Sequence, residues 1–160
     1  MPPRSLSIPA SVERLAEVRS FVRQAGAAFG ASSRATEDLV QAVDEAACNV
    51  IVHGYRGRAG DLRIQAEPRR DAIVIRLLDD APPFDPTKAP ASNLDRPPLR
   101  RRPGGMGVHL LTTMVDEVHH QARPGGGNEL LLVRRLGDDG GREPGSSRDP
   151  GRELPTREEG

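Results

Sequence analysis

The spacing of apolar residues along the chain changes between period two and period three to four, and each change predicts a new element. Leu6 and Ile8 alternate with polar residues up to Pro9, which predicts a short edge strand. Ser11 can cap a first helix, and Gly30 is placed to end it. The apolar stripe of that helix consists of Leu15, Val18, Val22, Ala25 and Phe29.

A second amphipathic helix is predicted over residues 36–55, with Ser32 or Ser33 as its cap. Its apolar stripe consists of Leu39, Val40, Val43, Ala46, Ala47, Val50 and Ile51. Beside this stripe a polar residue recurs every four positions, at Gln41, Glu45, Asn49 and His53. These side chains stack on one ridge that borders the buried face. Such a ridge is usually a solvated helix face, so alone it does not indicate catalysis.

Two hairpins are predicted in the second half of the chain. Alternation over residues 62–66, a turn, and the apolar run 72–78 form the first hairpin, whose second strand ends in Asp79. Residues 118–122 and 129–135 form the second, after a third helix. The order strand, two helices, hairpin, helix, hairpin predicts an α+β fold, a two-layer sandwich with helices on one face of a mostly antiparallel sheet.

Two segments lack any apolar period. Residues 81–103 are rich in proline and form either a lid over a ligand or a plain linker. Residues 137–160 consist mainly of glycine, proline and charged residues, which predicts a disordered tail. A single domain over residues 1–136 is therefore expected.

Composition narrows the classes of partner and compartment. Lys plus Arg and Asp plus Glu both number 23, so no net field attracts nucleic acid or an anionic membrane. Aromatic residues make up 2%, too few for base-stacking platforms. The single cysteine, Cys48, excludes an internal disulfide and is expected to be a small buried thiol. Without a signal peptide or a span of ~20 apolar residues, a cytoplasmic location is predicted.

Candidate chemistry lies at the strand end and at a glycine cluster. Asp79 is either an ordinary turn residue or a carboxylate that accepts from the 6-amino group of adenine and repels guanine, selecting ATP over GTP. Gly104, Gly105 and Gly107 either punctuate a loop or let backbone N–H groups reach phosphate at a helix start. The arginines at 100–102 either neutralise phosphate or keep the loop soluble.

Three motifs, EAACNVIVHGY, DDAPPFDP and GGMGVHLL, occur in an order and spacing that match a known superfamily. They resemble the Asn box and the first and second glycine boxes of the ATPases that include gyrase, the heat-shock chaperone, histidine kinases and mismatch-repair ATPases. Over about residues 6–136 the chain looks most like the anti-sigma-factor serine/threonine kinases of bacterial partner-switching systems.

This resemblance implies a Bergerat-type ATP-binding fold with ATP and Mg²⁺ as ligands. It also implies phosphorylation of a small anti-anti-sigma (STAS-type) protein and sequestration of a sigma factor or similar regulator. Relatives of this kind are commonly homodimers. Two other functions stay open: an ATP-gated module that sequesters a regulator without phosphorylating it, and a detached histidine-kinase-like domain that acts on a separate phosphoacceptor protein.

The resemblance also assigns roles by position. Glu45 matches the general base, Asn49 the amide that holds magnesium, and Asp79 the adenine-reading carboxylate. His53 matches a structural position, and the rival acid Asp44 points roughly 100° away from the ridge. The other nucleotide-binding positions implied are Ala81, Phe84, Arg101, Gly104, Gly105, Met106, Gly107 and Val108.

The sequence departs from the family pattern at one of these sites and at the start of the last strand. Ala81 stands where the first glycine box usually has Gly, which is tolerated if its φ is negative and strained otherwise. The last strand begins GNELLL, without the Thr that many relatives place near there to bind a phosphate or a structural water. ATP binding is thus better supported by the motifs than phosphoryl transfer.

Overall fold

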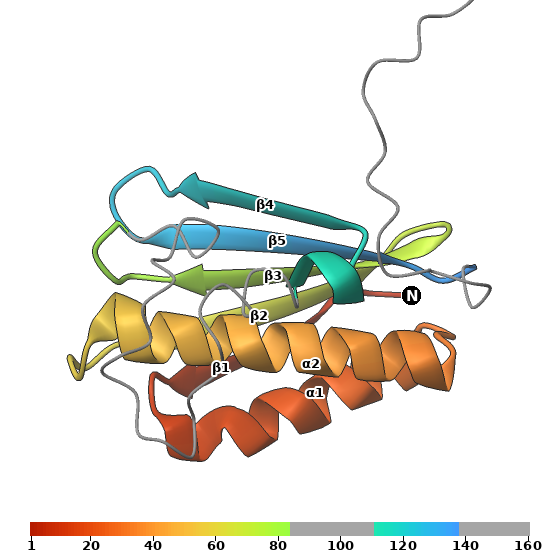
Figure 1. Ribbon diagram of the computed structural model, residues 1–160, viewed down its shortest axis with the longest axis horizontal. Helices are drawn as coiled ribbons and strands as arrows, with labels where there is room; N and C mark the ends of the chain where they lie inside the picture. Colours follow the sequence, from red (N-terminus) through yellow and green to blue (C-terminus); the bar gives the residue numbers. More distant parts are fainter. Residues whose placement is uncertain (84–110, 138–160) are drawn as a thin grey trace, which may run out of the picture.

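A five-stranded antiparallel sheet with two helices on one face forms the protein, as a computed structural model shows for residues 1–83 and 111–137 (Figure 1). The strand order is β1-β2-β3-β5-β4, and every neighbouring pair is antiparallel. The strands are β1 (Arg4–Pro9), β2 (Asp61–Pro68), β3 (Ala72–Asp79), β4 (Glu117–Ala122) and β5 (Asn128–Arg135). The predicted α+β sandwich is confirmed, with the Leu6 strand at one edge.

The first helix, α1 (Leu15–Ala28), follows a 3-10 turn, η1 (Val12–Arg14), and ends as predicted at Gly30 with φ 74°. The predicted cap at Ser11 is only half right. Ser11 precedes the turn, but its hydroxyl contacts the Glu13 carboxylate and no backbone N–H. The tight 3-10 turn is instead closed by the backbone bond from Arg14 N–H to the Ser11 carbonyl, 3.0 Å long.

The second helix, α2 (Ser33–Asn49), is capped by Ser32, whose hydroxyl accepts from the Ala35 N–H at 3.1 Å. The prediction of one α-helix to residue 55 is wrong at its end, because η2 (Val50–Tyr55) is a π-helix. It ends at Arg56 in the left-handed region with φ 52°. Val50 and Ile51 are buried there. A buried pair suits either helix type, so the apolar period could not reveal the wider turn.

The core lies between the helices and the sheet. The predicted stripes face it: all seven apolar positions of the second helix are buried, as are four of the five in α1, while Phe29 is partly buried. Cys48, expected to be buried, is only partly so. Each fully buried Val, Leu or Ile side chain stabilises the fold by ~1.5–3 kcal/mol through its transfer out of water. The largest fully buried side chains come from both layers and include Leu39, Val43, Ile64, Ile75, Leu77 and Leu132.

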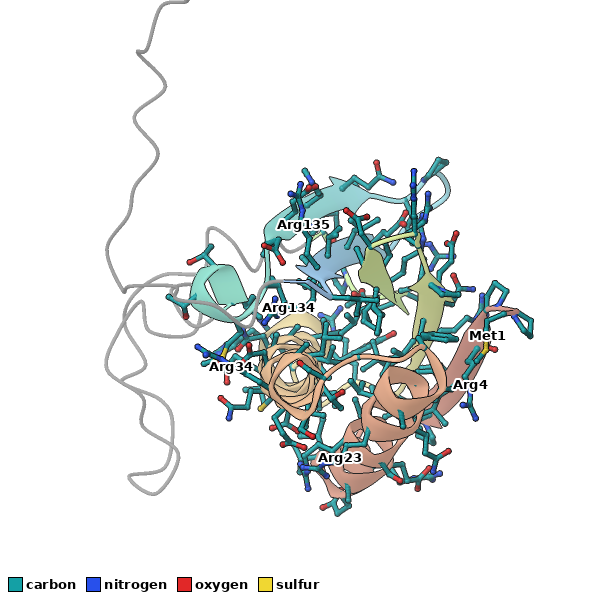
Figure 2. All side chains as sticks on the ribbon, turned by 90° about the vertical axis from the view of Figure 1, so that its right-hand side faces the viewer. Met1, Arg4, Arg23, Arg34, Arg134 and Arg135 are labelled. Atoms are coloured by element: carbon teal, nitrogen blue, oxygen red, sulfur yellow. The ribbon has the colours of Figure 1, made fainter. Side chains whose placement is uncertain are left out.

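The end of the molecule where α2 begins is held by a buried arginine. Arg134 of β5 lies between the sheet and α2 (Figure 2), with 3% of its side chain exposed. Its Nη2 is 3.1 Å from Asp38 Oδ2 on α2, and its Nη1 is 3.8 Å from Asp116 Oδ2 just before β4. The ion pairs therefore join the helical layer to the last hairpin.

Part of the predicted third helix is seen. Residues 111–114 are helical, and Leu111 and Val115 are buried in the core. Its predicted start at the glycine cluster lies outside the described residues, as do the proline-rich segment from residue 84 on and the tail from residue 138 on. Within the described ranges, no helix has both the length and the apolarity to cross a membrane.

Candidate functional site

The end of α2 and the end of β3 meet at one end of the sandwich, the left-hand end in Figure 1. Tyr55, the last residue of η2, joins them: its hydroxyl accepts from the Asp80 N–H at 2.9 Å and donates to the Asp61 carbonyl. A Cβ added to Gly54 would lie 3.3 Å from Ala81 Cβ. The wide π-turn therefore brings the segment after Asn49 into contact with the segment after Asp79.

The polar ridge of α2 divides into an exposed and a buried part. Gln41 is exposed, whereas Glu45 and Asn49 are each only 5% exposed and lie one turn apart. His53 lies in the π-helix and is half-buried. Lys, Glu and Asp side chains are seldom fully buried in proteins, so a buried acid beside a buried amide is more informative than the spacing alone.

Asp44 points in another direction than Glu45, as predicted. Its Oδ1 accepts from Arg19 Nη1 of α1 at 2.8 Å, and both side chains of the pair are partly exposed. This acid therefore joins the two helices and does not lie beside Asn49.

Asp79 ends β3 with 3% of its surface exposed. Its Oδ1 accepts two hydrogen bonds of 2.9 Å, from the Ala81 N–H and from Asn128 Nδ2. Burial raises the pKa of the Asp79 carboxyl above its usual value, and the bonds from Asn128 and Ala81 oppose that rise. The Asp79 carboxylate is therefore buried and fixed both by its own turn, through the Ala81 N–H, and by the opposite strand, through Asn128.

Ala81 is accommodated without strain. Among the described residues, Arg56 is the one non-glycine with positive φ, so the condition set for Ala81 is met. Its side chain is 1% exposed and packs beside Gly54. The missing glycine of the first box therefore does not distort the segment after Asp79.

The β4–β5 hairpin surrounds Asp79 with three residues that the sequence patterns did not reveal. Arg123 Nη1 donates to the Asp79 carbonyl and to Asp80 Oδ1, both at 3.1 Å. Gly127 has φ 91°, and a Cβ there would lie 2.0 Å from the Asp79 carbonyl oxygen. Asn128 completes the set. All three lie in the run RPGGGN, residues 123–128, which indicates a turn but not what the turn contacts.

The phosphate side of the site is only partly described. Asn49 is a buried residue whose side-chain amide includes an oxygen of the kind that binds Mg²⁺, which commonly takes one or two protein oxygens plus substrate phosphates and water. The described residues thus fit a phosphate-bound magnesium ion, although they contain no cluster of three His, Cys, Asp or Glu that could hold a metal by itself. The remaining predicted contacts, Phe84, Arg101 and residues 104–108, lie outside the described residues.

Comparison with known proteins identifies the fold and the family. The sequence profile of the histidine kinase-like ATPase domain matches residues 8–134. This range includes the predicted site residues that the structure describes, Glu45, Asn49, Asp79 and Ala81. The chain belongs to the histidine kinase-like ATPase family. Membership of an ATPase family implies nucleotide binding, which agrees with a buried acceptor at Asp79.

Within this family the chain is similar to anti-sigma-factor kinases, which confirms the resemblance seen in the motifs. It is 32% identical over 127 residues to the anti-sigma F factor of Clostridium beijerinckii, covering 75% of this chain and 87% of that protein. The anti-sigma F factor of Thermoanaerobacter pseudethanolicus is 30% identical over 124 residues, with the same coverages. The serine-protein kinase RsbW of Bacillus cereus is 25% identical over 117 residues, covering 71% and 73%.

A solved structure supports the fold. The crystal structure of RsbU and RsbW domains from Mycobacterium tuberculosis matches with a TM-score of 0.59 and 20% identity. The match covers 85% of this chain but only 32% of that longer one. At this identity the likeness extends to the architecture alone.

Proposed function

We propose that this chain is an ATP-dependent serine/threonine kinase of a cytoplasmic partner-switching system. It phosphorylates a serine of a small anti-anti-sigma (STAS-type) protein and sequesters a sigma factor or similar regulator, acting as a homodimer. The observation that carries the proposal is the burial of Glu45 and Asn49 one turn apart, on the helix whose end contacts the Asp79 segment. The names of the anti-sigma F factors and of RsbW support the choice of partners.

Each described site residue has a distinct task in this proposal. Asp79 accepts from the 6-amino group of adenine. The Asn49 amide oxygen would hold a magnesium ion, which when bound would supply positive charge to offset the negative charge of the phosphates. Glu45 accepts the proton of the partner's serine hydroxyl. The hydroxyl oxygen bonds to the γ-phosphorus while the bond to the β–γ bridging oxygen breaks and ADP leaves.

The phosphate contacts outside the described ranges complete the proposal. Arg101 offsets charge on the transferring phosphoryl group, and residues 104–108 supply backbone N–H groups to the phosphates. Ala81 and Phe84, at the start of the lid predicted over residues 81–103, contribute to nucleotide binding. These roles rest on the family motifs.

Phosphoryl transfer from radiolabelled ATP to a STAS-type protein encoded near this chain tests the assignment of Glu45. The chain offers a matched pair of variants, Glu45→Gln and Asp44→Asn, which neutralise adjacent acids. Loss of a general base lowers the rate of transfer ~10²–10⁴-fold, whereas ATP affinity should change little. Asp44→Asn should transfer at the wild-type rate, because Asp44 pairs with Arg19 and not with the site. Equal transfer by both variants would refute the role of Glu45.

A second candidate function is sequestration without chemistry. It is favoured by the name of the first relatives, anti-sigma F factor, which describes binding alone. In that case ATP strengthens a complex with the regulator, and no label reaches any partner. Label that is acid-labile instead of acid-stable would point to a histidine-kinase-like transfer.

A further inference from the structure

Asn128 occupies the position directly opposite Asp79 in the sheet. The register of β3 and β5 pairs these two residues, and both are buried, at 4% and 3% exposure. Side chains opposite one another in an antiparallel pair have Cβ atoms about 5 Å apart, which is within reach of an amide–carboxylate hydrogen bond. The contact therefore follows from the sheet and does not depend on a loop.

The surroundings of the Asn128 amide determine which way it points. Three oxygen acceptors lie around its Nδ2: Asp79 Oδ1 at 2.9 Å, the Pro82 carbonyl at 3.2 Å and the Ala81 carbonyl at 3.4 Å. Its Oδ1 lies 3.3 Å from His120 Nε2 on β4. The flipped amide would direct its oxygen at three acceptors, so only the orientation with nitrogen toward Asp79 is compatible with these neighbours.

Both hydrogen bonds that the Asp79 carboxylate accepts within the described ranges are made by the same oxygen. Asp79 Oδ1 receives the Ala81 N–H and Asn128 Nδ2, and no hydrogen bond within the described ranges uses Oδ2. An amide also has two N–H donors, whereas a Thr hydroxyl has one. Asn128 can therefore hold the carboxylate and the Pro82 carbonyl at the same time.

We propose that Asn128 is a positioning residue for base recognition: it fixes Asp79 so that Oδ2 faces the 6-amino group of adenine. The inference rests on the proposed nucleotide site and adds to it a specificity determinant in the last hairpin.

Asn128 also affects base selection through the charge of Asp79. Burial favours the neutral carboxyl, and the hydrogen bond from Asn128 is the largest influence that lowers the pKa of Asp79. The negative charge of Asp80 raises the pKa of Asp79, and the positive charge of Arg123 lowers it. A neutral carboxyl can donate to the guanine carbonyl, so loss of Asn128 relaxes base selection as well as misplacing Oδ2.

The test compares Asn128→Leu with Gln121→Leu. Gln121 lies on the same hairpin, and its Nε2 donates to Glu129 Oε2 at 2.8 Å, so its substitution also removes an amide–carboxylate bond but at an exposed place. The measurement is the Kd ratio between purine riboside triphosphate, which lacks the 6-amino group, and ATP. For the wild type and Gln121→Leu we expect a ratio of about 10 to 100. For Asn128→Leu we expect a ratio within about threefold of one.

A ratio in folded Asn128→Leu equal to that of the wild type would overturn the inference alone. A wild-type ratio near one would instead overturn the proposed recognition of adenine. Asn128→Ala, which removes the same donor with less crowding, gives the same comparison where the Leu variant does not fold.

A measurement without nucleotide tests the positioning role of Asn128 separately from the proposed recognition of adenine. The ¹³C resonance of the Asp79 carboxyl should titrate at higher pH in Asn128→Leu than in the wild type, and an unchanged titration would contradict the positioning role.

Discussion

Substituting Asp79 by Asn should have two effects. It should change the base preference of the site, and it should stabilise the fold at neutral pH. In the wild type, the Ala81 N–H and the Asn128 amide each donate to Asp79 Oδ1 at 2.9 Å. An Asn at this position keeps one carbonyl oxygen that can accept both bonds. The substitution replaces Oδ2 by an NH₂ group. This group is a donor, as is the 6-amino group of adenine, so the two cannot form a hydrogen bond. The same NH₂ group suits the carbonyl of guanine.

The loss of affinity for ATP follows from the bond removed. A hydrogen bond to a charged group contributes ~1.5–3 kcal/mol, so Asp79→Asn should weaken ATP binding about 10- to 150-fold. GTP binding should not weaken and should improve. Calorimetric titration of both nucleotides against wild type and variant measures the two constants.

Stability should change in the opposite direction. Because the pKa of Asp79 is raised in the folded protein, the folded state binds that proton more tightly than the unfolded state. The stabilising contribution of this carboxyl is therefore present at low pH and is lost as pH rises through the folded pKa. Asn carries no such charge, so the variant should match the wild type in acid and exceed it at neutral pH. A tenfold difference in proton affinity between the folded and unfolded states corresponds to about 1.4 kcal/mol.

Urea denaturation of both proteins without nucleotide, at acidic and at neutral pH, gives the free energies of unfolding. A variant that is less stable than the wild type at neutral pH would show that Asp79 is held by interactions that outweigh its burial. A variant that keeps the wild-type preference for ATP would refute the role of Asp79 in base recognition.

Two further substitutions test the hairpin and the opposite end of the sheet. Arg134→Met removes a cation that is 3% exposed and leaves two acids without it, so unfolding free energy should fall by about 3 kcal/mol. Arg23→Met, in an exposed pair, should cost less than ~1 kcal/mol, and equal losses would contradict the argument from burial. Gly127→Ala should weaken ATP binding, because its Cβ meets the Asp79 carbonyl, whereas Gly125→Ala also has a positive φ but nothing within 4 Å. Through positive φ alone, Gly125→Ala should lower the free energy of unfolding by ~1–2 kcal/mol, and Gly127→Ala should lower it further because of the clash. Equal ATP affinities of the two variants would refute the effect of the contact on the site.

The layers of this fold could be predicted because local patterns determine them. Leu6 and Ile8 indicated an edge strand since the alternation stopped at a proline, and Ser32 indicated a cap since an amphipathic helix followed. Such signals lie within a few residues of the element they predict. The widened turn at Val50 had no such signal, because its buried residues suit either helix.

The site could be predicted only where a motif carried it. Glu45, Asn49 and Asp79 were found through family motifs, and the structure buries all three. Asn128 was noted merely as the absence of a Thr, since its contact with Asp79 depends on the pairing of β3 with β5 across 49 residues. Sequence periodicity gives the faces of strands but not which residues stand opposite each other.

The intact mass of a STAS-type partner after incubation with this chain and Mg-ATP shows whether this chain transfers a phosphoryl group. We expect one added phosphoryl group on a serine with the wild type and with Asp44→Asn, and none with Glu45→Gln. A partner that stays unmodified with the wild type, in a complex that forms only with ATP, would contradict phosphoryl transfer and leave sequestration as the function.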